Sequence, residues 1–541
     1  MIEQNLIQQF NDILIALFST FMLYLLNKSL ISENKTAFII LFTITVAPLL
    51  IFSQAIYNKY LNYRSYHLIL YYISIIGLLC FSGLLINMIN KLPNYSNRFN
   101  EYLKYGIYFI ICFFIIHNYY IGKVKIGVIH SVTGATNAIP LVRMLKLHIT
   151  KLNENGGING RYIDAKFVDG KSDPEVYKKE TQKMIDEDIK VIFGGWTSAD
   201  RKAMKPIVEK NDALLFYPLQ YEGQECSKNI IYTGATPNQQ LEVGVRWALH
   251  NLGKSFYLVG TDSVYARTAY TIMKAVINKY GGNLIGEEYF PYGSTDYQDA
   301  VNKIMNNKSC IILNTINGTK ANIAFFGTMY NTYKEKIKNE SVYTPISEVY
   351  PIISFSVTEH TFSVMDNRYS IGHYAVWNYF QSIRSNINRD FVNEYKNFYI
   401  MDKNDGEGAL NVVNDPMESS YIALNLWARS ASHLDNVTDL EKIRDDMIEN
   451  PYEAPEGEVI LNNSNHLSKY VRVGMVNKNK LFDIVYNTVG PVDPRVWNIY
   501  LPGTAGLKCD HGKKLYGSRY KPGPMSLDVV REKQVGTIKE E

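Results

Sequence analysis

Four apolar runs in the first 123 residues constrain this chain more than any other feature. They cover residues 13–26, 37–56, 68–89 and 105–121, and none contains Lys, Arg, Asp or Glu. A helix needs about 20 mostly apolar residues, with a working range of roughly 17–25, to cross the hydrocarbon core of a bilayer. The second and third runs meet this length, the first is short, and the fourth relies on interfacial flanks such as Tyr119 and Tyr120. We therefore predict a transmembrane region over residues 1–123 with about four spans, and three spans are the alternative.

The charge of the chain divides at the same point. Residues 1–123 contain eight Lys/Arg and four Asp/Glu, and subtracting these from the 56 and 52 of the whole chain leaves 48 of each. The positive excess therefore lies between the predicted spans, where it weakly favours a non-cytoplasmic side for both termini and for the large C-terminal domain. We expect no cleaved signal peptide, because further apolar spans follow the first one. An even charge balance after residue 123 gives no reason to expect a nucleic-acid partner.

Residues 124–500 alternate between strand and helix patterns. We predict strands at 124–129, 162–168, 191–193, 214–217, 256–259, 284–289 and 310–314, and helices at 140–152, 173–188, 199–210, 239–251, 267–280 and 297–305. Alternating strands and helices favour parallel sheets wound on both faces, and this many strands favours two lobes. A helix near 419–431 and strands at 470–476 and 481–486 complete the pattern. Residues 501–541 form a polar basic tail, predicted to be solvated, with contact to anionic lipid as the alternative.

Common catalytic signatures are absent from the sequence. No phosphate loop, dinucleotide glycine fingerprint, nucleophile elbow or His-x-x-x-His pair occurs. Cys80 and Cys112 lie in the apolar runs, which leaves Cys226, Cys310 and Cys509, an odd number without metal-ligand spacing. We therefore expect buried or idle thiols, no metal, no cofactor and no enzymatic activity. An amide hydrolase is the enzyme alternative, but the nucleophile and base that it needs are not identified.

Polar and aromatic residues follow four of the predicted strands. They are Trp196, Thr197 and Ser198 after 191–193, Tyr217, Gln220 and Glu222 after 214–217, Asp262 and Tyr265 after 256–259, and residues 317–319 after 310–314. In doubly wound sheets, ligands bind beyond the carboxyl ends of the strands. Any single segment is better explained as capping residues or an ordinary turn, but four such segments at successive strand ends favour a ligand cleft.

The chain resembles the substrate-binding proteins of urea and short-chain amide ABC transporters, which are relatives of the amide-sensing regulator. The matching motifs are 156–160 (GGING), 193–198 (FGGWTS) with 201–203 (RKA), 215–218 (LFYP) with 220–223 (QYEG), 232–235 (YTGA) with 237–240 (PNQQ), 377–382 (WNYFQS), 415–418 (DPME), 454–457 (APEG) and 466–468 (HLS). The resemblance covers roughly residues 124–500. It implies a type I periplasmic-binding-protein fold, in which two α/β lobes close on a ligand through a multi-strand hinge.

The resemblance also implies that Trp196, Ser198, Tyr217 and Tyr265 line the cleft. A small neutral amide needs donors for its oxygen and acceptors for its nitrogens, enclosed by aromatic walls that exclude water. The full set of predicted ligand-binding residues is Trp196, Thr197, Ser198, Tyr217, Gln220, Asp262, Tyr265 and Glu418.

Two departures from the family pattern bear on the ligand. Ser263 stands where relatives usually have a tyrosine and Ala266 where they have a proline, which enlarges or wets the expected pocket. Four membrane spans in front of the lobes are not part of the family pattern either. We therefore expect a membrane-anchored solute-binding protein for urea or a small neutral amide, acting with membrane lipid and with a transporter or signalling partner. The alternatives are a receptor that signals through its membrane helices and a ligand-degenerate protein with a structural role.

Overall fold

The computed structural model describes residues 123–134, 138–400, 412–504 and 506–512. The predicted spans at 13–26, 37–56, 68–89 and 105–121, and tail residues 513–541, lie outside these ranges. Among the residues described, the structure has no helix with both the length and the apolar character needed to cross a bilayer.

The first lobe contains a five-stranded sheet in the order β2-β1-β3-β4-β5. Every neighbouring pair in this sheet is parallel. The strands are β1 (Lys123–His130), β2 (Tyr162–Asp169), β3 (Val191–Gly194), β4 (Leu214–Tyr217) and β5 (Ile230–Tyr232). The strands β3, β4 and β5 are buried at every residue, as parallel strands covered on both faces should be.

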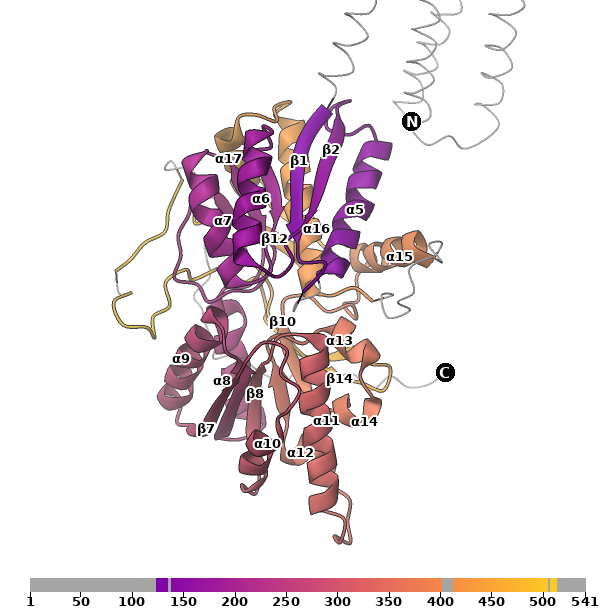
Figure 1. Ribbon diagram of the computed structural model, residues 1–541, viewed down its shortest axis with the longest axis vertical. Helices are drawn as coiled ribbons and strands as arrows, with labels where there is room; N and C mark the ends of the chain where they lie inside the picture. The colour runs from indigo at the N-terminus through magenta and orange to yellow at the C-terminus, as the bar shows by residue number, and fades with distance from the viewer. Residues whose placement is uncertain (1–122, 135–137, 401–411, 505, 513–541) are drawn as a thin grey trace, which may run out of the picture. The chain divides into compact units, whose positions relative to one another are not determined.

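Helices cover both faces of this first sheet (Figure 1). They are α5 (Ile139–Glu154), α6 (Pro174–Asp186), α7 (Ser198–Lys210), α16 (Asp415–His433) and α17 (Leu440–Glu449), and α15 (Asn386–Ile400) packs beside α5. The core on one face joins Val124 and Phe193 of the sheet to Trp427 of α16. The core on the other face joins Ile192 and Tyr217 to Met204 of α7.

The second lobe contains a seven-stranded sheet in the order β15-β14-β10-β9-β8-β6-β7. Its strands are β6 (Ser255–Thr261), β7 (Asn283–Phe290), β8 (Ile311–Thr315), β9 (Ile352–Ser354), β10 (Tyr374–Trp377), β14 (Arg472–Val476) and β15 (Phe482–Asn487). Its helices are α8 (Leu241–Asn251), α9 (Val264–Lys279), α10 (Gln298–Met305), α11 (Thr319–Lys336), α12 (Ile346–Val349), α13 (Glu359–Val364) and α14 (Asn367–Ser370), and a 3-10 turn η2 (Pro237–Gln239) precedes α8.

The predicted α/β fold with parallel sheets is confirmed, with one correction in the second lobe. Strands β14 and β15 pair antiparallel with each other, and β14 pairs antiparallel with β10. The reason is the short connection between β14 and β15, which turns where the Asn477 amide donates to the Leu481 carbonyl at 2.9 Å. A tight turn reverses the chain direction, whereas a parallel neighbour needs a long crossover.

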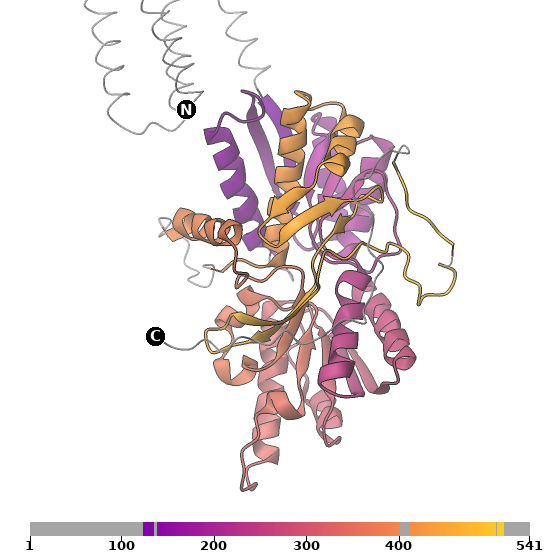
Figure 2. The same cartoon turned by 180° about the vertical axis from the view of Figure 1, so that it is seen from behind.

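A small antiparallel sheet completes the first lobe. It consists of β11 (Tyr452–Ala454), β12 (Gly457–Leu461) and β13 (Leu467–Ser468), and a parallel bridge between Tyr232 and His466 joins its end to β5. Within the described residues three passages, after β5, after β10 and after β13, link the sheets of the two lobes, and the chain after β15 returns once more to the first lobe. Figure 2 shows the last of these passages from behind, where the C-terminal strands run from one lobe into the other.

Candidate ligand-binding site

The turn after β3 leads into α7 and carries three of the predicted ligand residues. Gly195 has a φ of 89°, and a Cβ there would lie 2.9 Å from the Tyr217 ring, so this close approach requires glycine. Thr197 begins the helix: its hydroxyl accepts from the Asp200 amide at 3.1 Å, and the Asp200 carboxylate accepts from the Thr197 amide at 2.7 Å. This capping box occupies the Thr197 hydroxyl, so the structure gives Thr197 a structural role at this turn.

A buried guanidinium lies one turn further along α7. Arg201 is completely buried and donates to Glu222 Oε1 at 3.0 Å and to Glu225 Oε1 at 2.9 Å. Ser198 donates its hydroxyl to the other Glu222 oxygen and accepts from Arg201 at 3.3 Å. Burial by itself would lower the pKa of Arg201, but the two carboxylates raise this pKa well above its usual value. Arg201 therefore stays charged, and its charge is balanced by groups of the same lobe.

Aromatic rings surround this ionic group. Tyr217 at the end of β4 is fully buried, donates its hydroxyl to the Trp196 carbonyl at 3.0 Å, and places its ring 4.9 Å from the Arg201 guanidinium. Tyr265 comes from α9 of the other lobe. Burial raises the pKa of Tyr265, and the nearby Glu222 carboxylate raises it further. The structure thus brings the predicted residues Trp196, Ser198, Tyr217 and Tyr265 together across the two lobes.

Gln220 lies in the passage between the lobes. Its amide nitrogen donates to the carbonyl of Phe355 in the second lobe at 3.1 Å. Its Oε1 atom is buried and accepts no hydrogen bond from any described residue. A buried acceptor without a donor is costly, so this oxygen is suited to receive an N–H group from a bound molecule.

The other two predicted ligand residues lie elsewhere. Asp262 is exposed and forms a double hydrogen bond with Arg267 at 2.8 and 2.9 Å, and this pairing lowers the pKa of its carboxyl. Glu418 is fully buried in α16, where its Oε1 accepts from the Glu456 amide at 3.3 Å. Burial raises the pKa of Glu418, and the neighbouring Glu456 carboxylate raises it further. The structure brings neither residue into the group around Arg201.

Several residues of the site were not predicted from the sequence. Tyr221 stacks on Arg201 with its ring 4.6 Å away, and its hydroxyl lies 2.5 Å from His466 Nε2. The Nδ1 atom of His466 is 2.7 Å from the Ser464 carbonyl, so Nδ1 carries the proton and Tyr221 donates to Nε2. The position of Arg201, one turn after Ser198, was a usable signal for its role. No local pattern around Glu225 or His466 predicted that they lie in the site, because only the tertiary fold brings them there.

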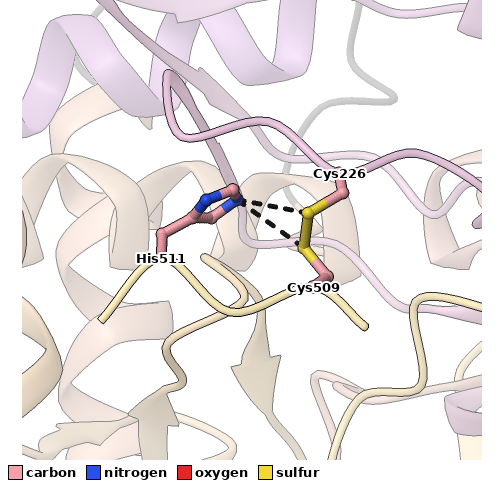
Figure 3. Close-up of side chains that lie close together, drawn as sticks. All are labelled: Cys226, Cys509 and His511. Atoms are coloured by element: carbon pink, nitrogen blue, oxygen red, sulfur yellow. Dashed lines mark hydrogen bonds between the residues drawn. A yellow bond between two sulfur atoms is a disulfide. The ribbon is translucent and has the colours of Figure 1, made fainter. Parts of the chain in front are cut away.

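The cysteines differ from the sequence expectation. Cys226 and Cys509 form a disulfide although 283 residues separate them, so the expectation of idle thiols is wrong for this pair (Figure 3). The chain after β15 returns to the loop that carries Glu222 and Glu225, where the Gln224 amide donates to the Val496 carbonyl at 2.8 Å. That return brings the two sulfurs together. The spacing of the cysteines in the sequence does not predict this pairing. Cys310 is buried and free, as expected.

Comparisons with known proteins agree on one architecture. A family model described as a periplasmic binding protein domain matches residues 124–503. Among solved structures, the chain is similar to a solute-binding protein of an ABC transporter from Rhodopseudomonas palustris in complex with 3,4-dihydroxybenzoic acid, with a TM-score of 0.59, 16% identity, and coverage of 69% of this chain and 99% of that one. It is also similar to a branched-chain amino acid ABC transporter periplasmic ligand-binding protein from Burkholderia xenovorans, with a TM-score of 0.56, 15% identity, and coverage of 68% and 96%.

Two curated proteins match over shorter stretches. A limonene hydroxylase from Geobacillus stearothermophilus is 30% identical over 128 residues, which are 24% of this chain and 22% of that protein. The Leu/Ile/Val-binding protein BraC3 from Rhizobium johnstonii is 20% identical over 195 residues, which are 35% of this chain and 53% of that protein. The chain therefore spans about half or less of the length of these curated relatives.

Proposed function

The chain belongs to the periplasmic binding protein family, and from this premise we propose that it is a solute-binding protein for urea or a short neutral amide. Capture takes place between the lobes, which move about the three chain passages. No bond is made or broken; the ligand binds the closed arrangement more tightly and so draws the lobes together. A partner protein that acts in transport or sensing then recognises the closed state.

The observation that carries the proposal is the charge of the site. Arg201 is already paired with Glu222 and Glu225, and Lys202 Nζ lies 3.6 Å from Glu222 Oε1, so the buried guanidinium has no unpaired charge to offer a ligand. A carboxylate ligand, such as the dihydroxybenzoate of the Rhodopseudomonas palustris protein, would enter beside two carboxylates without gaining an unpaired cation. A neutral amide needs no cation, and its NH₂ groups are donors suited to carboxylate oxygens.

The surrounding groups support the same ligand class. The unpartnered Gln220 Oε1 atom offers an acceptor for an amide N–H. Trp196 and Tyr265 are each half-buried, and their apolar ring surface is suited to keep water away from a small planar molecule. Shielding from water strengthens each hydrogen bond made to the ligand.

We also propose that residues 1–123 anchor this protein in a membrane and that the two lobes face a non-cytoplasmic compartment. The four apolar runs support the anchor, and the positive residues between them support the orientation. The disulfide between Cys226 and Cys509 supports the same side, because structural disulfides persist in oxidising compartments.

The test is isothermal titration calorimetry of the purified full-length chain with urea, acetamide, benzoate and leucine. We expect binding of urea or acetamide, with benzoate silent. Trp196→Ala and Tyr217→Ala should each weaken binding by more than about tenfold, since hot-spot aromatic truncations cost about 2 kcal/mol or more. The matched control is Tyr343→Ala, because Tyr343 is 66% exposed and far from this group in the sequence.

Two other outcomes of the titrations with these four ligands would favour a different function. Binding of benzoate or leucine alone would refute the amide assignment in favour of the ligand classes named for the relatives. Silence across the panel from a folded chain would instead favour the ligand-degenerate alternative, in which the lobes serve a structural role.

A further inference from the structure

An imidazole stands directly beside the disulfide that ties the C-terminal segment to the first lobe. His511 Nε2 lies 3.3 Å from Cys226 Sγ and 3.6 Å from Cys509 Sγ (Figure 3). The three potential ligand atoms all lie within 4.8 Å of one another, and all three residues are half-buried. We propose that reduction of this disulfide creates a zinc-binding site made of Cys226, Cys509 and His511.

The geometry of the three atoms is close to what zinc requires. Zn–S bonds of about 2.3 Å and Zn–N bonds of about 2.0–2.1 Å at tetrahedral angles place neighbouring ligand atoms roughly 3.5–3.8 Å apart. Both nitrogen–sulfur distances are within about 0.3 Å of that range. Only the two sulfurs must separate, from bonding distance to roughly 3.8 Å, and rotation of the two cysteine side chains provides this.

Both chain segments that carry the ligands are held independently of the disulfide. The His511 amide donates to the Asn463 carbonyl at 2.8 Å, which fixes the C-terminal segment. On the other side of the site, Ser227 next to Cys226 donates its hydroxyl to Glu209 at 2.7 Å. Because these contacts do not involve sulfur, reduction leaves both thiols and the imidazole near one another. A site that keeps its ligands close in the absence of metal binds it with a smaller ordering cost.

The ligand set selects the kind of metal. Thiolate and imidazole are soft to intermediate ligands that suit Zn²⁺ rather than Mg²⁺ or Ca²⁺, which prefer oxygen. Three protein ligands leave a fourth tetrahedral position, which a water molecule fills because the residues are only half-buried.

The disulfide and the zinc site are mutually exclusive states of the same atoms. A dithiol reductant supplies two electrons and two protons, the S–S bond breaks, each sulfur takes one proton, and the dithiol closes to its own disulfide. Zinc binding then releases the two thiol protons as the thiolates coordinate the metal. Either state keeps the C-terminal segment attached to the loop that follows Glu225.

The test uses the full-length chain, reduced with dithiothreitol and freed of it by gel filtration without oxygen. Titration with Co²⁺ should produce thiolate-to-cobalt charge-transfer bands in the near ultraviolet, and Zn²⁺ should abolish them by displacing the cobalt. The oxidised chain should give no such bands. His511→Ala should weaken Zn²⁺ binding by more than about tenfold, since losing even an outer partner of a zinc ligand costs that much. Cys310→Ser is the matched control and should keep the bands.

A second measurement covers the case in which a cysteine variant fails to fold. Zinc should protect Cys226 and Cys509 of the reduced wild-type chain from iodoacetamide, as read by peptide mass spectrometry. Absence of charge-transfer bands from a reduced chain, or equal labelling of both thiols with and without zinc, would overturn the proposal. A Zn²⁺ affinity that is unchanged in His511→Ala would also overturn it.

Discussion

At the scale of single residues, Arg201 is the group on which the candidate site depends. Replacing Arg201 by methionine keeps much of the side-chain volume but leaves Glu222 and Glu225 buried without their cation. We expect Arg201→Met to lower the free energy of unfolding by about 3–5 kcal/mol, the usual cost of breaking a buried ion pair from one side. Denaturation by guanidinium chloride measures this change, because urea is itself the proposed ligand.

The control for that substitution is an arginine on the surface. Arg389 pairs with Asp390 while their side chains are 63% and 69% exposed. Arg389→Met should cost less than about 1 kcal/mol, because exposed ion pairs contribute little. Equal losses for the two variants would contradict the importance given to the buried group.

A buried histidine makes stability depend on pH. Burial lowers the pKa of His373 to about 3, and its Nδ1 accepts from the Ile352 amide at 3.0 Å. As the pH falls below 6.5, the imidazole of His373 becomes protonated in the unfolded chain but stays neutral in the folded chain. The contribution of His373 to the free energy of unfolding is therefore complete above pH 6.5 and is lost as the pH falls towards 3. Between about pH 7 and about pH 5 the residue should account for a loss of about 2 kcal/mol.

His373→Asn tests this, because the asparagine Oδ1 replaces Nδ1 as the acceptor but does not titrate. We expect the variant to lose less stability than the wild type over the same pH interval, as measured by denaturation at each pH. Any packing loss is the same at both pH values and cancels from the difference. His250→Asn, at an exposed position on α8, should keep the wild-type slope.

Residue patterns predicted part of the site and missed part of it. Trp196, Ser198 and Tyr217 follow strands directly, and the position after a parallel strand is visible in a sequence. Glu225 and His466 reach Arg201 and Tyr221 by way of a long loop and a distant sheet. Asp262 lies directly after β6, yet it faces solvent, because the end of a strand does not reveal which way the side chains that follow it point.

At the scale of elements, helix α7 positions the site and depends on the residue that caps its N-terminus, Thr197. Thr197→Ala removes the hydroxyl that caps the Asp200 amide, and we expect a loss of about 0.5–2 kcal/mol in the free energy of unfolding. Thr197→Ser keeps the capping oxygen and should restore most of the loss. A serine variant as unstable as the alanine variant would show that the methyl group, not the cap, is what matters here.

Elements with a strong local signal were predicted closely. Helix α7 begins at Ser198 against an expected start at 199, and β1 covers 123–130 against an expected 124–129. Helix α11 was not anticipated. Its buried Ala321, Phe325, Met329 and Tyr333 recur every four residues, but further apolar residues at Ile323, Ala324 and Tyr330 blur the periodicity in the sequence. The direction of β14 and β15 also escaped prediction, since the pattern of a strand does not state the direction of its neighbour.

At the scale of the whole molecule, the family resemblance noted in the sequence is confirmed for periplasmic binding proteins, and specificity for urea or amides stays a prediction. The disulfide is the feature at this scale that was not predicted from the sequence. It closes a loop of 283 residues, and cross-links of long loops limit the unfolded chain most strongly.

We expect Cys226→Ser combined with Cys509→Ser to lower stability by about 2–5 kcal/mol, seen as a lower melting temperature in calorimetry. Dithiothreitol should lower the melting temperature of the wild type in the same direction and leave the double variant unchanged. A double variant that still responds to the reductant would show that another group is responsible.

The three passages of the chain between the lobes have a consequence for synthesis on the ribosome. The core of the first lobe joins Val124 in β1 to Leu467 in β13, so neither lobe is a continuous piece of chain. At about 5–20 residues per second, roughly 20–70 seconds separate the making of these two core residues. For most of that interval the sheet face that packs on α16 lacks this partner, because α16 has not yet been translated, and a chaperone that shields nascent chains would protect that face.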